Sequence, residues 1–367
     1  ARRKRSRRAG AGMSTLVEEW SEQVRAAARS GAHLAIRGGG SKRFYGGEER
    51  GEVLAVGGYQ GIVAYEPTEL VVTARAGTLL AELNQVLAER GQWLAFEPPA
   101  CGPTATVGGM LASGLSGPRR QTAGAVRDFV LGVRILNGLA EVLSFGGQVM
   151  KNVAGYDVSR LMAGSLGTLG LVLEVSFKVL PLPVAEKSLR FSLGEAAALE
   201  KLNQWAGRPL PISASAWHDD VLTLRLSGAA AAVTAAGRTL GGEALDDSAA
   251  LAFWQAVREQ QHAFFAGEAP LWRLSLPSLA PCQKLGPIFI EWGGAQRWLR
   301  GGDPQEIRRA AEMAGGHATL FRADAALKAA VGVFQPLSAP LARIHRQLKL
   351  AFDPSGVFNP GRMYPDL

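Results

Sequence analysis

The sequence predicts an α+β protein with two domains, and three observations lead to this prediction. The chain has 367 residues, and at roughly 100–200 residues per domain this length fits two domains. Residues 31–178 hold 26 of the 45 glycines, whereas six of the eight tryptophans lie between Trp205 and Trp298. Signals for short strands and amphipathic helices occur on both sides of this change in composition, as in α+β folds.

The composition excludes several classes of protein. Hydrophobic residues make up 47% and charged residues 20% of the chain, which excludes general disorder. No apolar run approaches the ~18 residues of a membrane helix. With only Cys101 and Cys282, a disulfide framework, a four-cysteine zinc site and a cysteine-ligated iron–sulfur cluster are excluded. We therefore expect a reducing, cytoplasmic setting.

Much of the net charge of +8 comes from the N-terminus. Six basic residues fall between Arg2 and Arg8, and without them 34 basic residues face 32 acidic ones. No apolar segment follows, so a signal peptide is not indicated. We expect residues 1–13 to be a disordered basic leader, with Met13 as a natural start of the protein. Nucleic-acid binding by this arm is the minor alternative.

The first domain, residues 14–184, is predicted to contain turns rich in glycine between short elements. Thr15 and Glu18 form a capping box for a helix that ends at Gly31. Strands are expected at residues 33–37 and 70–75, followed by a helix at residues 78–90. Asn137-Gly138 separates two apolar runs, residues 129–136 and 139–145, which predicts a type I′ hairpin. A strand at residues 171–180 precedes the expected domain boundary at Pro181.

The second domain, residues 185–339, is expected to be an antiparallel sheet with helices on one face. A hairpin should turn at Asp219-Asp220. Helices are expected at residues 195–206, 229–240, 249–265 and 304–314, and strands at residues 188–193, 212–218, 221–226, 271–276, 287–292 and 318–321. The clustered tryptophans favour an aromatic core, with an exposed docking surface as the alternative. Residues 340–367 are expected to return to the first domain.

The strand ending in Gly38-Gly39-Gly40 suggests a phosphate cradle, because consecutive main-chain N–H groups form an anion-binding nest. It is not a P-loop, since no Gly-Lys-Ser/Thr occurs. It is not a dinucleotide fingerprint either, since residues 43–50 do not open a long apolar helix. Several glycine blocks that converge on one extended ligand remain the main interpretation, and buried glycine turns without a ligand remain the alternative.

Five groups of residues carry a resemblance to a known family. They are Arg37-Gly-Gly-Gly-Ser-Lys42; Thr106-Val-Gly-Gly109 with Ser113-Gly114; Gly124 with Arg127-Asp128; Lys151 to Asp157 with Gly164 to Gly170; and Phe352 to Gly361. In this order they resemble the FAD-binding domain of the vanillyl-alcohol oxidase / p-cresol methylhydroxylase (PCMH-type) flavoproteins. Within that family the chain is most similar to the FAD-binding subunits of bacterial glycolate oxidases. The resemblance covers residues 14–184 and 340–367 and implies a PCMH-type FAD-binding domain with a smaller ferredoxin-like cap.

The resemblance also implies roles for individual residues. Main-chain groups of the first motif would hold the FAD pyrophosphate, residues of the second would follow the cofactor towards the flavin, and Gly124 and Asp128 would close a third side. The segment around Gly170 would meet the adenine or the neighbouring phosphate, and Asn359 would lie near the isoalloxazine. The implied cofactor-binding residues are Arg37, Gly38, Gly39, Gly40, Ser41, Lys42, Thr106, Gly108, Gly109, Ser113, Gly114, Gly124, Asp128, Gly170, Leu171, Val172 and Asn359. Asp157 and Arg160 are expected to be a structural charge pair.

Departures from the family pattern qualify these roles. Many relatives attach the flavin to a histidine in the first glycine loop, where this chain has Ser41. Cys101 lies too far before Thr106 to match a cysteinyl linkage, so the FAD is expected to be non-covalent. The family's frequent tyrosine before Gly124 is Ala123 here, and its acidic residue in the last glycine motif is Leu166.

The catalytic cluster of the family is missing. Catalytic 2-hydroxy-acid dehydrogenases of the family carry an H-x-G-D-G-x-x-H-like cluster that binds metal and substrate. The five histidines of this chain form no such cluster, so no metal site is expected. His345 and Asn359 are the weak catalytic candidates, and Arg225, Arg273, Arg297 and Arg300 are undistinguished candidates for a carboxylate clamp.

The resemblance implies an FAD-dependent oxidoreductase that acts on the CH–OH group of 2-hydroxy acids as part of a complex. Its flavin would relay electrons or be structural. The implied partners are a paralogous catalytic FAD subunit and an iron–sulfur subunit. Attachment to the inner membrane through these partner subunits is the alternative to a purely cytoplasmic location. An autonomous FAD-dependent dehydrogenase of the D-lactate type is the alternative, and a cofactor-free scaffold is a third hypothesis.

Overall fold

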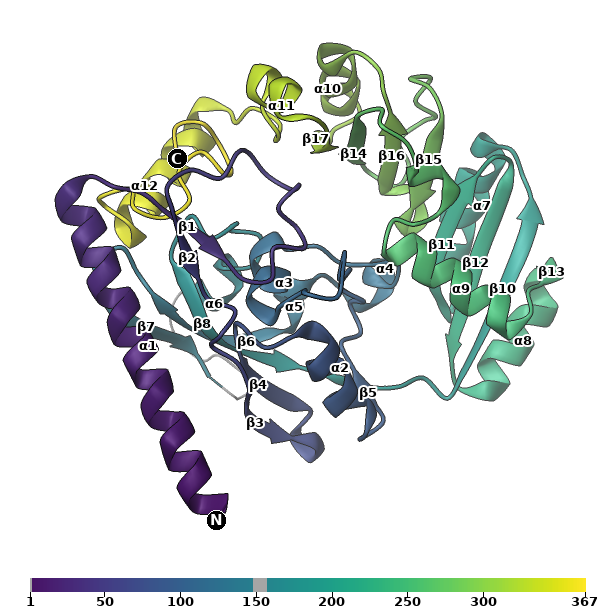
Figure 1. The fold of residues 1–367 in the computed structure, drawn as a ribbon. Helices are drawn as coiled ribbons and strands as arrows, with labels where there is room; N and C mark the ends of the chain where they lie inside the picture. Colours follow the sequence, from purple (N-terminus) through teal and green to yellow (C-terminus); the bar gives the residue numbers. More distant parts are fainter. Residues whose placement is uncertain (1, 148–156) are drawn as a thin grey trace.

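The computed structural model describes residues 2–147 and 157–367 of the chain, with side chains from residue 14 onward. It is a mixed helix and sheet protein in which two bodies of secondary structure lie side by side (Figure 1). Among the described residues, all strand pairs are antiparallel except β1–β2, which forms a separate two-stranded sheet. The α+β fold class predicted from the sequence is confirmed.

The first body is built on a five-stranded sheet with strand order β3-β4-β8-β6-β7, next to the parallel pair β1–β2. Its successive elements are α1 (Arg2–Ser30), β1 (Leu34–Arg37), β2 (Glu52–Ala55), β3 (Ile62–Glu66), β4 (Val71–Arg75), α2 (Leu80–Ala88), β5 (Gln92–Trp93), α3 (Val107–Ser113), α4 (Arg120–Ala123), α5 (Val126–Phe129), β6 (Val130–Leu136), β7 (Val142–Gly146), α6 (Val158–Leu161), β8 (Leu171–Lys178) and β9 (Leu180–Pro181).

The second body is an eight-stranded antiparallel sheet with strand order β13-β10-β12-β11-β15-β16-β14-β17. Its elements are β10 (Ala185–Ser192), α7 (Glu195–Ala206), β11 (Ile212–His218), β12 (Val221–Gly228), α8 (Ala230–Leu240), β13 (Glu243–Ala244), α9 (Asp247–Arg258), β14 (Leu271–Ser275), β15 (Ile288–Glu291), β16 (Gln296–Arg300), α10 (Pro304–Met313) and β17 (His317–Arg322). We call this body, with α11 (Ala325–Val331), the cap. We propose boundaries after residues 184 and 339, and α12 (Ala339–Phe352) opens the last segment.

Strand β8 is buried on both faces because two cores meet at it. Leu171 and Leu173 face the core formed with α1, β1 and β2. Val172 faces the other core, which contains residues of α2 and α3. The last segment joins the first of these cores, since Val357 and Phe358 are fully buried in it and Phe358 bridges to Leu34. Residues 357–359 therefore lie beside β1, close to where the glycine loop begins.

The helices of the cap differ from the expectation of one covered face. Trp217 of β11 packs with α7, and Ala216, its neighbour on the strand, packs with Trp254 of α9. Helices therefore lie on both faces. On the α9 side, Tyr45 and Leu115 of the first domain also pack against the sheet of the cap. Because this face is covered partly by a helix and partly by the first domain, the cap sequence alone did not predict helices on both faces.

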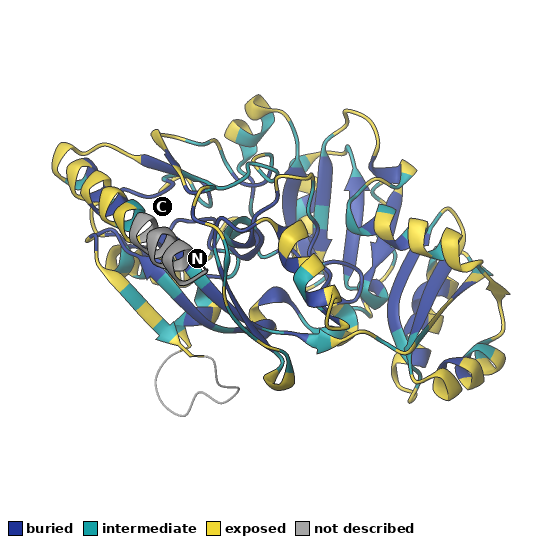
Figure 2. Cartoon of the chain, turned by 60° about the horizontal axis from the view of Figure 1, so that its bottom comes forward, coloured by how far each residue is buried: buried dark blue, intermediate teal, exposed yellow. Residues whose placement is uncertain are grey.

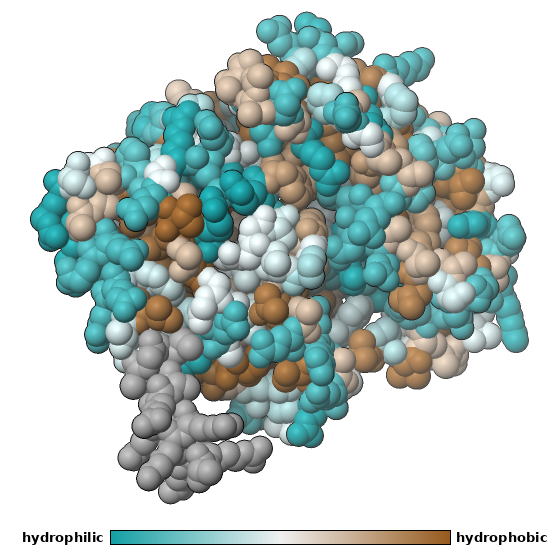
Figure 3. All heavy atoms as spheres, in the orientation of Figure 1, coloured by the Kyte–Doolittle hydropathy of each residue, from teal (hydrophilic) through white to brown (hydrophobic). Residues whose placement is uncertain are grey.

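The tryptophan cluster is core, as the sequence favoured. Trp205, Trp217, Trp254, Trp272 and Trp298 are buried, and the central strands of the cap are mainly dark blue in Figure 2. The alternative of a docking surface built from these tryptophans is wrong. On the face drawn in Figure 3, hydrophobic residues are scattered between hydrophilic ones.

Two hairpins test the turn predictions with opposite results. Asp219 and Asp220 have φ of 49° and 58°, as a type I′ turn requires. The Asn137-Gly138 turn is instead a longer loop that Asn137 closes by donating its N–H to Glu141 O over 3.0 Å. Gly138 donates its N–H to Phe352 O, and a Cβ there would lie 2.2 Å from Asp353 Oδ1. Close approach of α12, rather than a tight hairpin, requires this glycine.

The N-terminal helix also differs from the expectation. We expected a disordered leader over residues 1–13, whereas α1 already begins at Arg2. Arginine and alanine, which are frequent here, are among the strongest helix formers. Asp157 and Arg160 form the expected ion pair at 2.8 Å, while residues 151–156 of that motif lie outside the described residues. None of the described helices is both long and apolar enough to cross a membrane.

Candidate cofactor-binding site

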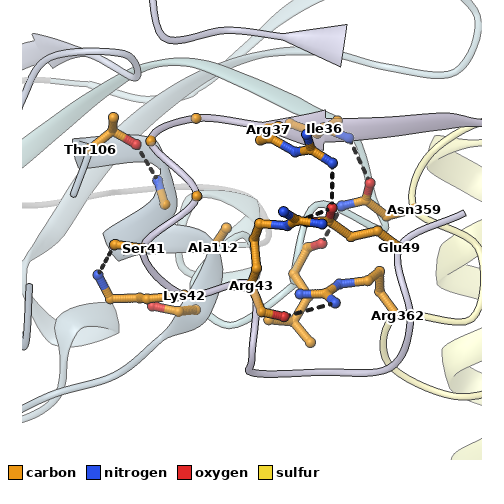
Figure 4. A pocket seen from close by; sticks show the side chains of 16 residues that line it. Ile36, Arg37, Ser41, Lys42, Arg43, Glu49, Thr106, Ala112, Asn359 and Arg362 are labelled. Carbon is orange, nitrogen blue, oxygen red and sulfur yellow. Dashed lines mark hydrogen bonds and ion pairs between the residues drawn. The ribbon is translucent and has the colours of Figure 1, made fainter. Parts of the chain in front are cut away.

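A small cavity lies where the glycine loop, α3 and the last segment meet (Figure 4). Its volume is about 100 Å³, which suits a phosphate-sized part of a ligand better than a whole dinucleotide, because whole drug-sized ligands occupy roughly 300–1,000 Å³. Sixteen residues line it: Ile36, Arg37, Gly38, Gly39, Gly40, Ser41, Lys42, Arg43, Glu49, Thr106, Gly109, Ala112, Ser113, Leu166, Asn359 and Arg362.

The loop from Gly38 to Lys42 presents main chain to this cavity. Among the described residues, none accepts a hydrogen bond from its N–H groups. Gly40 has φ of 72°, which an L-residue rarely adopts, and Arg43 N donates to Gly40 O over 3.2 Å. A run of free N–H groups at such a turn is the geometry of an anion-binding nest.

The glycines also allow a neighbouring segment to approach. A Cβ on Gly39 would lie 1.5 Å from Thr104 O, and one on Gly38 would lie 2.5 Å from Thr106 Oγ1. Thr104 Oγ1 donates to Gly39 O over 2.7 Å. The first two glycines therefore bring the loop against residues 104–106, which lead directly into α3.

Helix α3 forms the second wall of the cavity. Thr106 is its N-cap, and its Oγ1 accepts a hydrogen bond from Gly109 N at 3.2 Å. Gly109 and Ser113 line the cavity, whereas Gly108 is turned to Ala76, where a Cβ would lie 2.8 Å from Ala76 Cβ. Gly114 ends the helix with φ of 65° and packs on Gly164. Gly108 and Gly114 thus shape the wall without lining it.

Positive charge surrounds the nest. Arg37 and Arg43 both pair with Glu49, at 2.7 Å and 3.0 Å. Arg37 Nε is buried and has no hydrogen-bond partner among the described residues. Lys42 Nζ donates to Ala100 O over 3.0 Å, and burial lowers the pKa of Lys42. An unsatisfied buried donor on a cation at the edge of a nest fits an anionic ligand.

Asn359 joins the last segment to this site. Its Oδ1 accepts from Ile36 N at 2.8 Å, and its Nδ2 donates to Leu166 O over 2.6 Å. The side chain is buried and the residue has φ of 44°. Both ends of the amide are committed to main chain, so Asn359 fixes the geometry of the cavity rather than presenting a free reactive group.

Other residues that the resemblance implied lie away from the cavity. Asp128 accepts a hydrogen bond from Ala125 N at 2.8 Å and packs against Gly124, so this pair shapes a local turn. Gly170 lies over Leu136 O, while Leu171 and Val172 point into the two cores. None of these five residues lines the cavity of the nest.

No metal site or catalytic histidine emerges in the described part of the chain. It contains no group of three or more histidine, cysteine, aspartate or glutamate residues placed to hold a metal ion. His345 stacks edge-on against Tyr364 and does not line the nest cavity. The fold does bring His218 and His262 together, with ring centroids 5.7 Å apart, although they are 44 residues apart in sequence.

The four candidate arginines of the cap prove to be different from one another. Arg225 pairs with Glu97 at 2.9 Å, Arg297 is fully buried and donates to main-chain carbonyls such as Gly294 O, and Arg300 donates to Phe264 O. Arg273 instead donates to Tyr45 Oη over 3.2 Å, next to the loop that follows the nest. Only tertiary contacts could make this distinction.

Sequence reasoning missed several residues that shape the site. Arg362 donates to Tyr45 O over 2.6 Å and to Gly47 O. Glu259 and Lys328 of the cap contact the segments that flank the nest. Arg362 follows the Asn-Pro-Gly motif directly, which was a usable signal, whereas the sequence around Glu259 and Lys328 contained none.

Comparison with known proteins agrees with this geometry. The family described as "FAD binding domain" matches residues 15–146. The chain is 51% identical over 348 residues to glycolate oxidase subunit GlcE of Escherichia coli (strain K12), covering 94% of this chain and 97% of that protein. It is 32% identical over 141 residues to glycolate oxidase subunit GlcD of Bacillus subtilis (strain 168), covering 38% and 30% of the two chains.

A solved structure of an alkyldihydroxyacetonephosphate synthase has the same fold. It superposes with a TM-score of 0.65 at 14% identity, over 94% of this chain and 75% of that one. At this identity the likeness concerns the fold alone. The free N–H groups and the unpartnered Arg37 Nε fit the anionic part of FAD, so the donors present agree with the family match.

Proposed function

From the premise that this chain belongs to the family of the glycolate oxidase subunit GlcE and has an FAD-binding domain, we propose that it is the FAD-binding subunit of a complex that oxidises glycolate or a related 2-hydroxy acid. The observation that supports this most directly is the nest of residues 38–42. When bound, FAD would supply acceptance and transfer of electrons. Main-chain N–H groups of the nest, with Arg37, would hold its pyrophosphate.

We propose that the cofactor is held without a covalent bond. Ser41 stands in the loop where relatives carry a histidine, and Ser41 Oγ donates to Ala100 O over 2.9 Å. Cys101 does not line the cavity, and burial raises the pKa of its thiol, which disfavours the nucleophilic thiolate. The affinity for FAD would then depend on the main-chain N–H groups of residues 38–42, on Arg37 and on the loops that hold them in place.

The described residues favour a relay or structural role for the flavin over a complete active site. Oxidation of a 2-hydroxy acid requires a base for the hydroxyl proton and a cation for the carboxylate. Among the residues that the structure describes, no histidine, aspartate or tyrosine lines the nest cavity. Glu49, which does line it, is paired with Arg37 and Arg43. We therefore propose that a paralogous catalytic FAD subunit and an iron–sulfur subunit complete the complex.

A flavin spectrum tests cofactor binding, and purification of the complex tests the partners. The purified chain should be yellow and should release FAD when it is denatured. The tagged chain should co-purify with a second flavoprotein and with a protein that contains iron and acid-labile sulfide. Colourless protein with no affinity for added FAD would contradict the proposal.

One observation favours a second candidate, an autonomous dehydrogenase. Arg273 contacts Tyr45 Oη, and the charge of Arg273 contributes, after burial and Arg127, to lowering the pKa of Arg120. Positive charge from the cap and from α4 thus gathers at the domain boundary, where a carboxylate could bind. If the isolated chain reduced a dye with glycolate or D-lactate, this candidate would replace the accessory role.

A further inference from the structure

The cap reaches the segments on both sides of the nest with charged side chains. On one side stands Glu259, the C-cap residue that directly follows α9. Its Oε2 accepts hydrogen bonds from Ala100 N at 3.0 Å and from Cys101 N at 2.9 Å. The carboxylate is mostly buried, and Arg258 Nε donates to its other oxygen over 2.8 Å.

The peptide held by Glu259 in turn holds the nest. Ala100 O accepts from Ser41 Oγ at 2.9 Å and from Lys42 Nζ at 3.0 Å. Cys101 has φ of 54°, a conformation that costs energy in a residue other than glycine. Glu259 therefore fixes an otherwise unfavourable turn whose carbonyl anchors the last two residues of the nest.

On the other side stands Lys328 of α11. Its Nζ donates to Phe44 O and, over 3.4 Å, to Gly46 O. These carbonyls belong to residues 43–47, which follow the nest directly. Arg362 donates to Tyr45 O and Gly47 O from the last segment, so two cations from different parts of the chain hold one short loop.

Aromatic packing shows that this loop is seated in the cap. The rings of Phe44 and Tyr45 lie 5.4 Å and 5.1 Å from the ring of Phe321 in β17. The guanidinium of Arg322 lies 5.0 Å from the centre of the Phe44 ring. Phe44 and Tyr45 therefore anchor residues 43–47 to the cap.

We propose that Glu259 and Lys328 are positioning residues that order the nest for FAD, so that docking of the cap and binding of FAD are thermodynamically coupled. The inference rests on the FAD-binding function proposed above. Hydrogen bonds to a charged partner are roughly twice as strong as neutral ones. A loop ordered in advance loses less entropy when its ligand binds, and by linkage the ligand strengthens cap docking in return.

Protonation of Lys328 gives the proposal a pH signature. Burial, followed by the charges of Arg362 and Arg322, lowers the pKa of Lys328 to about 8. Lys328 lines a second cavity, beside residues 43–50, and the other charged groups on that cavity are Arg43, Glu48, Glu49, Arg50 and Arg362. Of these, Glu49 is already paired to Arg37 and Arg43. Above pH 8 the ammonium becomes a neutral amine, and its bonds to Phe44 O and Gly46 O lose their charge.

The test measures the dissociation constant of FAD by titrating deflavinated full-length protein and following flavin fluorescence. Glu259→Gln and Lys328→Gln should each raise this constant about 5- to 50-fold, within the usual range of coupling between sites. The matched controls Glu268→Gln and Lys284→Gln change exposed cap residues with no ion pair among the described residues, and they should bind FAD like the wild type.

Two readouts separate positioning from simple stabilisation. Lys328→Arg should restore most of the affinity, since arginine donates to carbonyls and stays charged. It should also abolish the rise in the FAD dissociation constant that the wild type shows between pH 7 and pH 9. As the reciprocal effect, added FAD should slow proteolysis at residues 181–185 more in the wild type than in Lys328→Gln.

Each result has a defined meaning. Wild-type protein that binds no FAD would contradict the proposed function itself. Wild-type protein that binds FAD, together with Glu259→Gln and Lys328→Gln variants of unchanged affinity, would overturn the positioning role alone. If Lys328→Gln does not fold, a Lys328→Arg variant that keeps the wild-type pH profile would also overturn it.

Discussion

Two segments of the first domain both contain glycines that suggested a cofactor contact, but in the structure the two segments have different roles. Residues 38–42 line the cavity, and their N–H groups have no acceptor among the described residues. Gly170 and the residues after it enter β8, where Leu171 and Val172 fill two hydrophobic cores. A glycine run that follows the end of an edge strand leaves main chain for a ligand, whereas glycine at the start of a central strand serves close packing.

The largest expected effect is at Gly39. A Cβ there would meet Thr104 O at 1.5 Å, so Gly39→Ala must push the loop away from residues 104–106 and spoil the nest. We expect more than a 100-fold loss of FAD affinity, about 3 kcal/mol, measured by flavin fluorescence. Gly58→Ala is the matched control, because a Cβ on Gly58 meets nothing within 4 Å. Unchanged FAD affinity in Gly39→Ala would show that the nest is not part of the FAD-binding site.

The other segment should respond in the opposite way. Leu171 is buried in β8, and Leu171→Ala should lower the free energy of unfolding by about 2–5 kcal/mol through lost burial and cavity formation. Denaturant unfolding of the deflavinated protein measures this change. The folded fraction should bind FAD within about twofold of the wild type, because Leu171 does not line the cavity. A large loss of FAD affinity would indicate that Leu171 contacts the cofactor, as the family resemblance implied.

Arg37 allows the contribution of a single side chain of the nest cavity to FAD binding to be measured. Its Nε is buried without a partner, and its other end pairs with Glu49. Arg37→Gln should weaken FAD binding about tenfold, near 1.4 kcal/mol, because a charged donor to the phosphate is lost. Isothermal titration at low and high salt checks this result, and the variant should show the weaker salt dependence.

Glu291 in the cap provides the contrast of a buried polar group that already has partners. Trp298 Nε1 and Gln296 Nε2 donate to its carboxylate over 2.5 Å and 2.9 Å. Burial nevertheless raises its pKa from 4.5 to about 7. The folded state thus holds a proton that the unfolded state releases between pH 4.5 and 7, so this carboxyl lowers stability as pH rises through that window.

The expected result is a change in the pH dependence of stability without a change in cofactor binding. Between pH 5 and 7, Glu291→Gln should remove up to about 1 kcal/mol per pH unit from the slope of stability against pH. Thermal unfolding at several pH values measures this slope. FAD affinity should stay at the wild-type level, and a loss would mean that Glu291 acts on the site.

Parts of the fold followed from local signals. The hairpin turn at Asp219-Asp220 and the ion pair of Asp157 with Arg160 were both predicted, and each depends on a few neighbouring residues. The prediction of a type I′ hairpin at Asn137-Gly138 failed because Gly138 is required by its close contact with Asp353, a residue more than 200 positions away in the sequence. Neighbouring residues therefore do not predict a conformation that depends on a contact with a residue distant in the sequence.

The sequence by itself determined which class of ligand the first domain could hold. Because glycine has no Cβ, it adopts positive φ readily and lets a ligand approach the main chain, so Gly38, Gly39 and Gly40 predicted a nest without any knowledge of the fold. The tertiary structure alone decided which glycine blocks reach the cavity, and that Glu259 and Lys328 of the cap contact the segments that flank the nest. Lys328 and Phe44 are 284 residues apart, and contacts over such separations exist only after the two domains have packed together.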